Sequence, residues 1–170
     1  DWLGFFSVTA GIGANVLTKY FEDRKDDYNA FLSKNLADRL AEAFTELLHQ
    51  KVRAELWGYN PNEAMTADKI LHEKYRGIRP APGYPACPDH RGKQFIFSLL
   101  DTTKNTGMLL TENMAMIPGS SVSGYFFSHP NSQYFNVGKV GTDQVRDYAR
   151  RLKLSVEETE KFFPTYLNYK

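Results

Sequence analysis

The sequence has one cysteine, no long apolar run and no excess of either charge. Cys87 alone cannot form an internal disulfide or a cysteine-rich zinc site, which favours a reducing, cytoplasmic compartment. No apolar run reaches the ~18 residues needed to cross a bilayer, so we expect no membrane partner. Lys and Arg number 21 against 20 Asp and Glu, and this balance does not predict binding to nucleic acid.

The motifs of several enzyme classes are also missing. Gly11-x-Gly13 lacks the third glycine of a dinucleotide fingerprint, and no G-x-S-x-G nucleophile elbow is present. Cys87-x-x-His90 is only half of a metal-binding pattern, because there is no second cysteine. We therefore predict no catalytic side chain and no metal ligand.

The chain has 170 residues, of which 42% are hydrophobic, enough for one domain with its own core. Apolar spacing predicts an α+β fold, with a helix-rich first part followed by short strands. The turn at 129–132 predicts that the last two strands form an antiparallel hairpin. We expect strands over 2–10 (a central strand covered on both faces), 109–117, 121–127 and 134–140, and helices over 14–23, 27–57, 67–74, 93–104, 143–151 and 155–163.

The longest predicted helix follows an N-cap at Asp26 and runs to Trp57, about 45 Å at ~1.5 Å per residue. We expect its apolar row to be buried. Glu42 lies at the edge of that row, four residues after Asp38, so both acids face either the sheet or solvent. The row consists of Tyr28, Phe31, Leu32, Leu36, Leu40, Phe44, Leu47, Leu48, Val52 and Leu56.

The segment 76–90, RGIRPAPGYPACPDH, contains four prolines and cannot be a helix or a central strand. A loop this rigid can present main-chain groups to a ligand, and Gly83 would let a ligand approach closely. Arg79 suits a carboxylate or phosphate; alternatively it pairs with a helix acid such as Glu73. Tyr84 and Tyr134 either stack on a ligand or belong to the core.

The same loop carries a specific resemblance. Residues 79–85, RPAPGYP, match the R-x-x-x-G-Y-P signature of the activation domain of cobalamin-dependent methionine synthases. Further blocks that are similar to this family span nearly the whole chain: DDY at 26–28, ADRLAEAF at 37–44, GIRPAPGYPACPDH at 77–90, SVSG at 121–124, FSHP at 127–130, YF at 134–135, VGK at 137–139 and DQV-x-DYARR at 143–151.

The resemblance implies a C-shaped α+β domain with a twisted antiparallel sheet that binds S-adenosylmethionine in a shallow groove. Arg79 would meet the ligand's carboxylate, the Ala81 and Gly83 main chain would lie along it, and Tyr84 would line the site. Tyr134 and Phe135 would contact the adenosine. Glu42 and Glu73 would attract the amino group or the sulfonium.

In that family the domain restores an enzyme whose cobalamin has been oxidised to cob(II)alamin. The methyl group comes from S-adenosylmethionine and one electron comes from flavodoxin or a flavodoxin-like reductase. The cobalamin is held by another module of the same enzyme, which is therefore an expected partner. Because the cobalt and the sulfonium carry the chemistry, the domain needs only to position the donor.

The family's domain begins upstream of the position equivalent to Asp1, and that stretch carries an acidic ligand contact and part of the sheet. We therefore expect 1–170 to be an activation domain whose N-terminal part is missing, not a complete enzyme. Two alternatives stay open: a non-catalytic docking module for a cobalamin-binding protein, and a methyltransferase acting on another acceptor.

Overall fold

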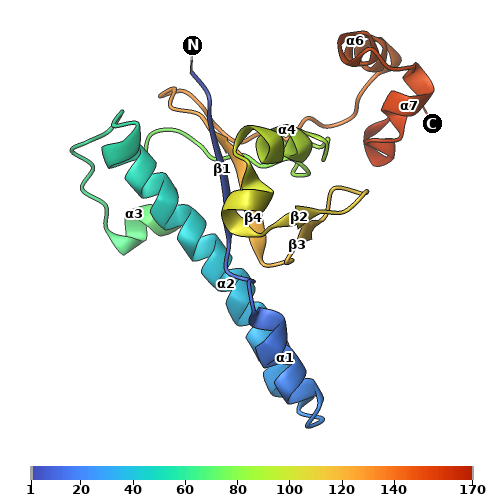
Figure 1. The fold of residues 1–170 in the computed structure, drawn as a ribbon. Coiled ribbons are helices and arrows are strands. Elements are labelled where there is room, and N and C mark those ends of the chain that lie inside the picture. The colour runs from blue at the N-terminus through green and yellow to red at the C-terminus, as the bar shows by residue number, and fades with distance from the viewer. Residues whose placement is uncertain (1, 170) are drawn as a thin grey trace.

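A computed structural model describes residues 2–169; Asp1 and Lys170, the ends of the predicted domain, lie outside them. The α+β class and the long helix are confirmed (Figure 1). The elements in chain order are β1 (Gly4–Thr9), α1 (Ala14–Glu22), α2 (Asp27–Lys51), the π-helical turn η1 (Val52–Leu56), α3 (Ala67–Leu71), α4 (Gly92–Leu99), α5 (Thr102–Thr106), β2 (Leu109–Leu110), β3 (Met116–Ile117), β4 (Ser121–Phe126), α6 (Thr142–Leu152), α7 (Val156–Glu160) and the 3-10 turn η2 (Pro164–Tyr166).

Strand β4 pairs with β1, the two strands being antiparallel from Gly4 opposite Phe126 to Thr9 opposite Ser121. The predicted hairpin between 121–127 and 134–140 is therefore wrong. The other edge of β4 is occupied by the proline loop, since Phe127 and Ile78 exchange backbone hydrogen bonds of 3.0 Å. Segment 134–140 forms no strand and includes Gly138 at φ +69°.

Strand β1 lies between helices. Phe5 packs edge-on against Phe95 of α4, whereas its neighbour Phe6 packs with Val52 of η1. Successive side chains of a strand point to opposite faces, so the predicted coverage of both faces is confirmed. Its predicted central position is wrong within residues 2–169, because β4 is its only strand partner there.

Two further predicted elements are interrupted by left-handed residues. The helix predicted over 93–104 divides into α4 and α5 because Asp101 has φ +48°. The strand predicted over 109–117 is two short strands, β2 and β3, around a turn closed by a 2.9 Å bond from the Thr111 amide to the Ala115 carbonyl. Met114 in that turn has φ +61°, which an extended strand does not allow.

Helix α2 begins as predicted, with Asp26 accepting a hydrogen bond from the Asn29 amide at 3.1 Å. It continues through η1 to Leu56, where the Trp57 amide bonds to the Val52 carbonyl. Of the predicted apolar row, however, only Val52 in η1 is buried, and the buried face of α2 is formed by other residues. It is a stripe of small and polar residues that allows the sheet and α1 to approach closely: Ala30, Ser33, Ala37, Ala41, Thr45 and His49.

Two separate clusters of buried hydrophobic residues stabilise the fold. One joins β1, β4 and η1, and consists of Phe6, Val8, Val52 and Phe126. The other lies in the C-terminal lobe, which we define as residues 140–167 and which stands apart from the sheet in Figure 1. It consists of Val140, Val145, Phe163 and Leu167. No helix within residues 2–169 combines the length and apolar character of a membrane span.

Candidate functional site

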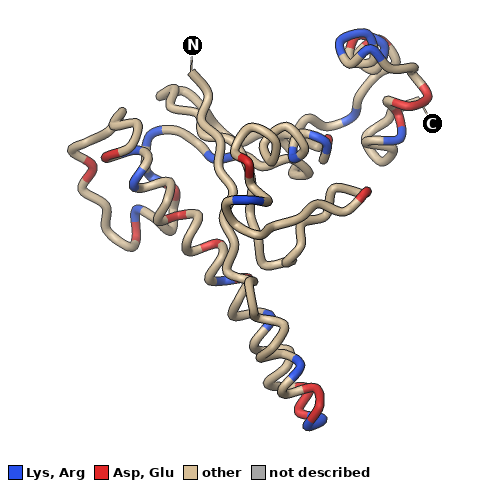
Figure 2. Tube along the Cα trace, in the orientation of Figure 1, with Lys and Arg blue, Asp and Glu red and all other residues tan. Residues whose placement is uncertain are grey.

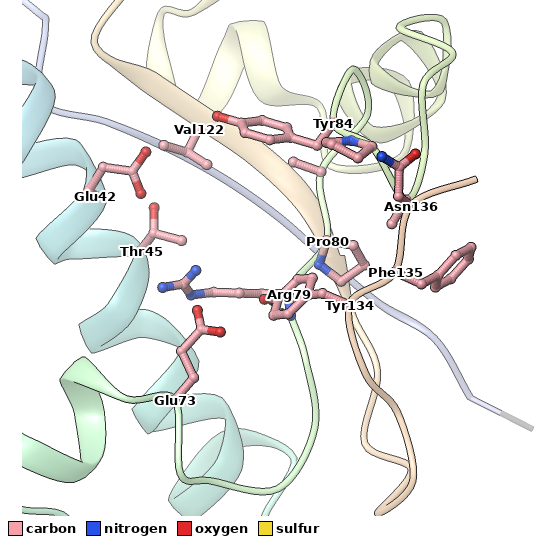
Figure 3. A pocket seen from close by; sticks show the side chains of 13 residues that line it. Glu42, Thr45, Glu73, Arg79, Pro80, Tyr84, Val122, Tyr134, Phe135 and Asn136 are labelled. Atoms are coloured by element: carbon pink, nitrogen blue, oxygen red, sulfur yellow. Dashed lines mark hydrogen bonds between the residues drawn. The ribbon is translucent and has the colours of Figure 1, made fainter. Parts of the chain in front are cut away.

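The largest set of predicted site residues meets at one cavity of about 540 Å³, enclosed by α2, the proline loop and the segment after β4 (Figure 3). Seven of the eight predicted residues line it: Glu42, Glu73, Arg79, Ala81, Tyr84, Tyr134 and Phe135. Sequence reasoning missed Thr45, Pro80, Pro85, Ala86, Val122 and Asn136. The volume of the cavity lies within the usual range for small-molecule sites, ~300–1,000 Å³.

The proline loop is held by its backbone. Pro80 accepts a 2.9 Å hydrogen bond from the Tyr125 amide of β4, which fixes the residue after Arg79 against the sheet. Beyond it the loop closes on itself, since the Gly83 amide donates to the Cys87 carbonyl at 2.7 Å. These bonds and the fixed φ angles of the prolines make one rigid wall of the cavity.

Gly83 is the predicted residue that does not line the cavity. It has φ +99°, and a Cβ there would lie 2.2 Å from Cε1 of His90. The side on which a side chain would project is thus filled by an imidazole ring. Glycine is required here because of His90 and the left-handed backbone, and contact of the Gly83 main chain with a ligand stays a prediction.

Arg79 extends from the loop toward α2 (Figure 3), and only 18% of its side chain is exposed. Its Nη2 donates to Oε2 of Glu46 at 2.7 Å, so its helix partner is Glu46 and not the Glu73 that we considered. Its Nε is buried without a hydrogen-bond partner among the described residues. Burial lowers the pKa of Arg79, but the electrostatic effect of Tyr75, Glu46 and Glu73 is larger, so the pKa is raised overall.

Two carboxylates face the same end of the cavity. Glu42 projects from α2 one turn before Thr45, and Glu73 lies on the loop after α3, across the Arg79 guanidinium from it (Figure 3). Glu73 has φ +49°, a conformation that L residues seldom adopt. This end of the cavity therefore combines one cation with two anions, a set that complements a zwitterionic amino acid.

The opposite side of the cavity is aromatic. Tyr84 and Phe135 are 59% and 60% exposed, so their faces are available to a ligand. The Tyr134 hydroxyl accepts a 3.0 Å hydrogen bond from the Arg79 amide, which ties this ring to the loop. Burial raises the pKa of Tyr134. Segment 134–138 is held by a 3.0 Å bond from the Val137 amide to the Pro85 carbonyl rather than by a strand partner.

The remaining candidates lie elsewhere. Asp38 accepts a 2.5 Å hydrogen bond from Ser120, away from this cavity. Within residues 2–169 no three His, Cys, Asp or Glu side chains gather in a way that could hold a metal ion. Acidic and basic residues are interspersed along the chain in Figure 2.

An α+β scaffold that gathers a guanidinium, two carboxylates and three aromatic rings around one cavity defines a small-molecule-binding domain. Residues 1–153 match the family model of the vitamin B12 dependent methionine synthase activation domain. The chain belongs to this family. A crystal structure of the MetH reactivation domain bound to AdoHcy matches with a TM-score of 0.96 and 52% identity over 99% of this chain. This chain corresponds to 52% of that solved chain, about half its length.

Proposed function

We propose that this chain binds S-adenosylmethionine in the cavity at Arg79 and serves in the reactivation of a cobalamin-dependent methionine synthase. Membership of the activation-domain family supports this proposal, as does the solved relative, which is bound to AdoHcy. AdoHcy is what S-adenosylmethionine becomes after losing its methyl group. The observation that carries the proposal is the Arg79 guanidinium, which lines the cavity and has a buried donor without a partner.

Each predicted residue has a part in this proposal. Arg79 binds the ligand's carboxylate, and Glu42 and Glu73 attract its ammonium and sulfonium charges. The Ala81 main chain lies along the ligand, while Gly83 shapes the loop. The rings of Tyr84, Tyr134 and Phe135 take the adenosine, since aromatic faces stack on purine rings.

The bound donor would supply a methyl group with AdoHcy as the leaving group, and the acceptor would be the cobalt of the cobalamin module after its reduction by one electron. The residues of this chain orient the donor and leave its methyl side accessible. No proton is transferred, so no acid–base pair is needed around the cavity. We propose that the partners are the cobalamin module and an electron donor of the flavodoxin type, acting in the cytoplasm, where a lone free Cys87 is stable.

Calorimetric titration with S-adenosylmethionine and with AdoHcy tests the proposal. Arg79→Ala should weaken binding by at least about tenfold, because a charge-assisted hydrogen bond is lost. Arg150→Ala, which removes an exposed arginine on α6, is the matched control and should change nothing. Equal affinities of the Arg79 variant and the parent would refute the site. A parent that binds neither ligand would favour the docking-module alternative.

A further inference from the structure

Behind the cavity lies a row of four alternating charges, Glu63, Arg53, Glu46 and Arg79. We propose that Glu46 is a positioning residue that fixes the Arg79 guanidinium for the carboxylate of the ligand, with Arg53 and Glu63 fixing Glu46 in turn. The inference rests on the proposed function, because it requires Arg79 to be the carboxylate anchor. Glu46 itself does not line the cavity.

The inner pair of the row is fully buried. The side chains of Arg53 and Glu63 are 0% and 1% exposed, and Nε and Nη2 of Arg53 each donate to Glu63 at 2.7 Å. Asn60 donates a further bond to Glu63 at 3.1 Å, and the Arg53 guanidinium lies 3.8 Å from the centre of the Tyr75 ring. The two charges cannot turn toward solvent, so they give the next carboxylate a fixed electrostatic environment.

Glu46 connects this pair to the cavity. Its Oε2 accepts from Nη2 of Arg79 at 2.7 Å and from the Tyr75 hydroxyl at 3.1 Å. Its Oε1 lies 3.8 Å from Nη1 of Arg53, and neither of these buried atoms has a hydrogen-bond partner among the described residues. The carboxylate is thus held by a guanidinium on each side and by a hydroxyl whose pKa is raised by burial, so that it stays a donor.

The ion pair with Glu46 sets the orientation of the Arg79 guanidinium. An arginine side chain loses rotamer entropy when it is immobilised. Because Glu46 already immobilises the guanidinium through Nη2, the ligand's carboxylate meets a fork whose orientation is set. The two carboxylates and two guanidiniums of the row also balance in charge, so Arg79 is not left as an isolated buried cation.

The test compares two ligands that differ only in the carboxylate: AdoHcy and S-adenosyl-3-thiopropylamine, its decarboxylated analogue. Glu46→Gln should weaken AdoHcy binding about tenfold, as expected for loss of a charged hydrogen-bond partner, and change binding of the analogue less than about twofold. Tyr75→Phe, which keeps the ring over Arg53 and removes one bond to Glu46, should give a smaller loss with the same selectivity. Glu55→Gln, an exposed carboxylate in η1, is the matched control.

Each other outcome overturns the inference. An equal loss for both ligands would make Glu46 a structural residue, and tighter AdoHcy binding by Glu46→Gln would make it a competitor of the ligand for Arg79. If Glu46→Gln does not fold, an unselective or absent effect of Tyr75→Phe decides against the inference. Arg79→Ala separates the two proposals. If this variant binds AdoHcy as tightly as the parent, the proposed function fails. If Arg79→Ala weakens AdoHcy binding and Glu46→Gln does not, only the positioning role is refuted.

Discussion

Tyr148 of α6 donates a 2.7 Å hydrogen bond to Oδ2 of Asp89, at the end of the proline loop. The same carboxylate accepts hydrogen bonds from the backbone amide, Nε and Nη2 of Arg91. The Arg91 guanidinium in turn lies 3.2 Å from the centre of the Phe162 ring. One carboxylate therefore joins the loop that forms the cavity to the C-terminal lobe. Although burial acts against it, these hydrogen bonds hold the pKa of Asp89 below its usual value.

Removing the Tyr148 hydroxyl should loosen this junction. We expect Tyr148→Phe to lower the free energy of unfolding by about 1.5 kcal/mol, because a hydrogen bond to a buried charged group is lost. Denaturant unfolding followed by circular dichroism measures the change. Tyr28→Phe, at a residue that is 74% exposed, is the control and should leave the midpoint where it is. Identical midpoints for the parent and Tyr148→Phe would show that the junction does not stabilise the fold.

His49 predicts a pH dependence of stability. Its side chain is fully buried, stacked on Phe126, and burial together with Arg53 and Arg79 lowers its pKa to about 3. Between pH 6.5 and about 3 the unfolded chain binds a proton that the folded protein does not, so stability falls as the pH falls.

The slope from this one group approaches 1.4 kcal/mol per pH unit below pH 6. His49→Gln removes the titrating ring. The difference in unfolding free energy between the parent and this variant should therefore change steadily from pH 7 to pH 4.5, in the direction that favours the variant at low pH. A constant difference over this range would mean that the pKa of His49 is the same in the folded and the unfolded chain.

Substitutions at Gly83 and Gly138 distinguish two costs of a side chain in a left-handed position, namely backbone strain and steric clash with a neighbour. Gly138 has φ +69° with nothing within 4 Å of an added Cβ, so Gly138→Ala should cost only the backbone strain, about 1 kcal/mol. Gly83→Ala meets the His90 ring as well and should cost about 3 kcal/mol. Thermal unfolding measures both. His90→Ala in the Gly83→Ala background should recover the part that is due to the clash.

The exposed apolar row of α2 predicts self-association of the isolated chain. Phe31, Leu36 and Leu40 are 67%, 55% and 52% exposed, and contiguous apolar surface of this kind favours association. Leu40→Glu should reduce dye binding and aggregation and change the unfolding free energy by less than about 0.5 kcal/mol. Its neighbour Ala41 is 1% exposed, so Ala41→Glu should abolish folding. If Leu40→Glu does not change aggregation, the surface that mediates self-association lies outside this row.

Features set by neighbouring residues could be predicted from the sequence. The caps at Asp26, Thr66 and Ser155 each accept a hydrogen bond from an amide three residues later, which the residue types alone indicate. The irregular loop follows from its prolines. The set of cavity residues, in contrast, came from the family resemblance, because residues as distant as Glu42 and Phe135 meet only through the fold.

Features set by distant partners could not be predicted. Segment 134–140 has strand-like residues, yet β4 is paired on one edge by β1 and on the other by Ile78, so no edge is left for it. By residue type alone, Glu46 cannot be distinguished from a solvated helix acid. The available signal was its position one turn after Glu42 and seven residues before Arg53, a spacing that places all three on one side of the helix.

The pairing of β1 with β4 has a consequence for the order of assembly. Thr9 and Ser121 are 112 residues apart in sequence, and closing so long a loop is slow compared with forming α2. The wall that contains Tyr134 and Phe135 follows β4 in the chain. A chain emerging from the ribosome therefore holds only a partial cavity until residue 137 has left the exit tunnel, and ligand capture reports that the segment after β4 has reached the proline loop.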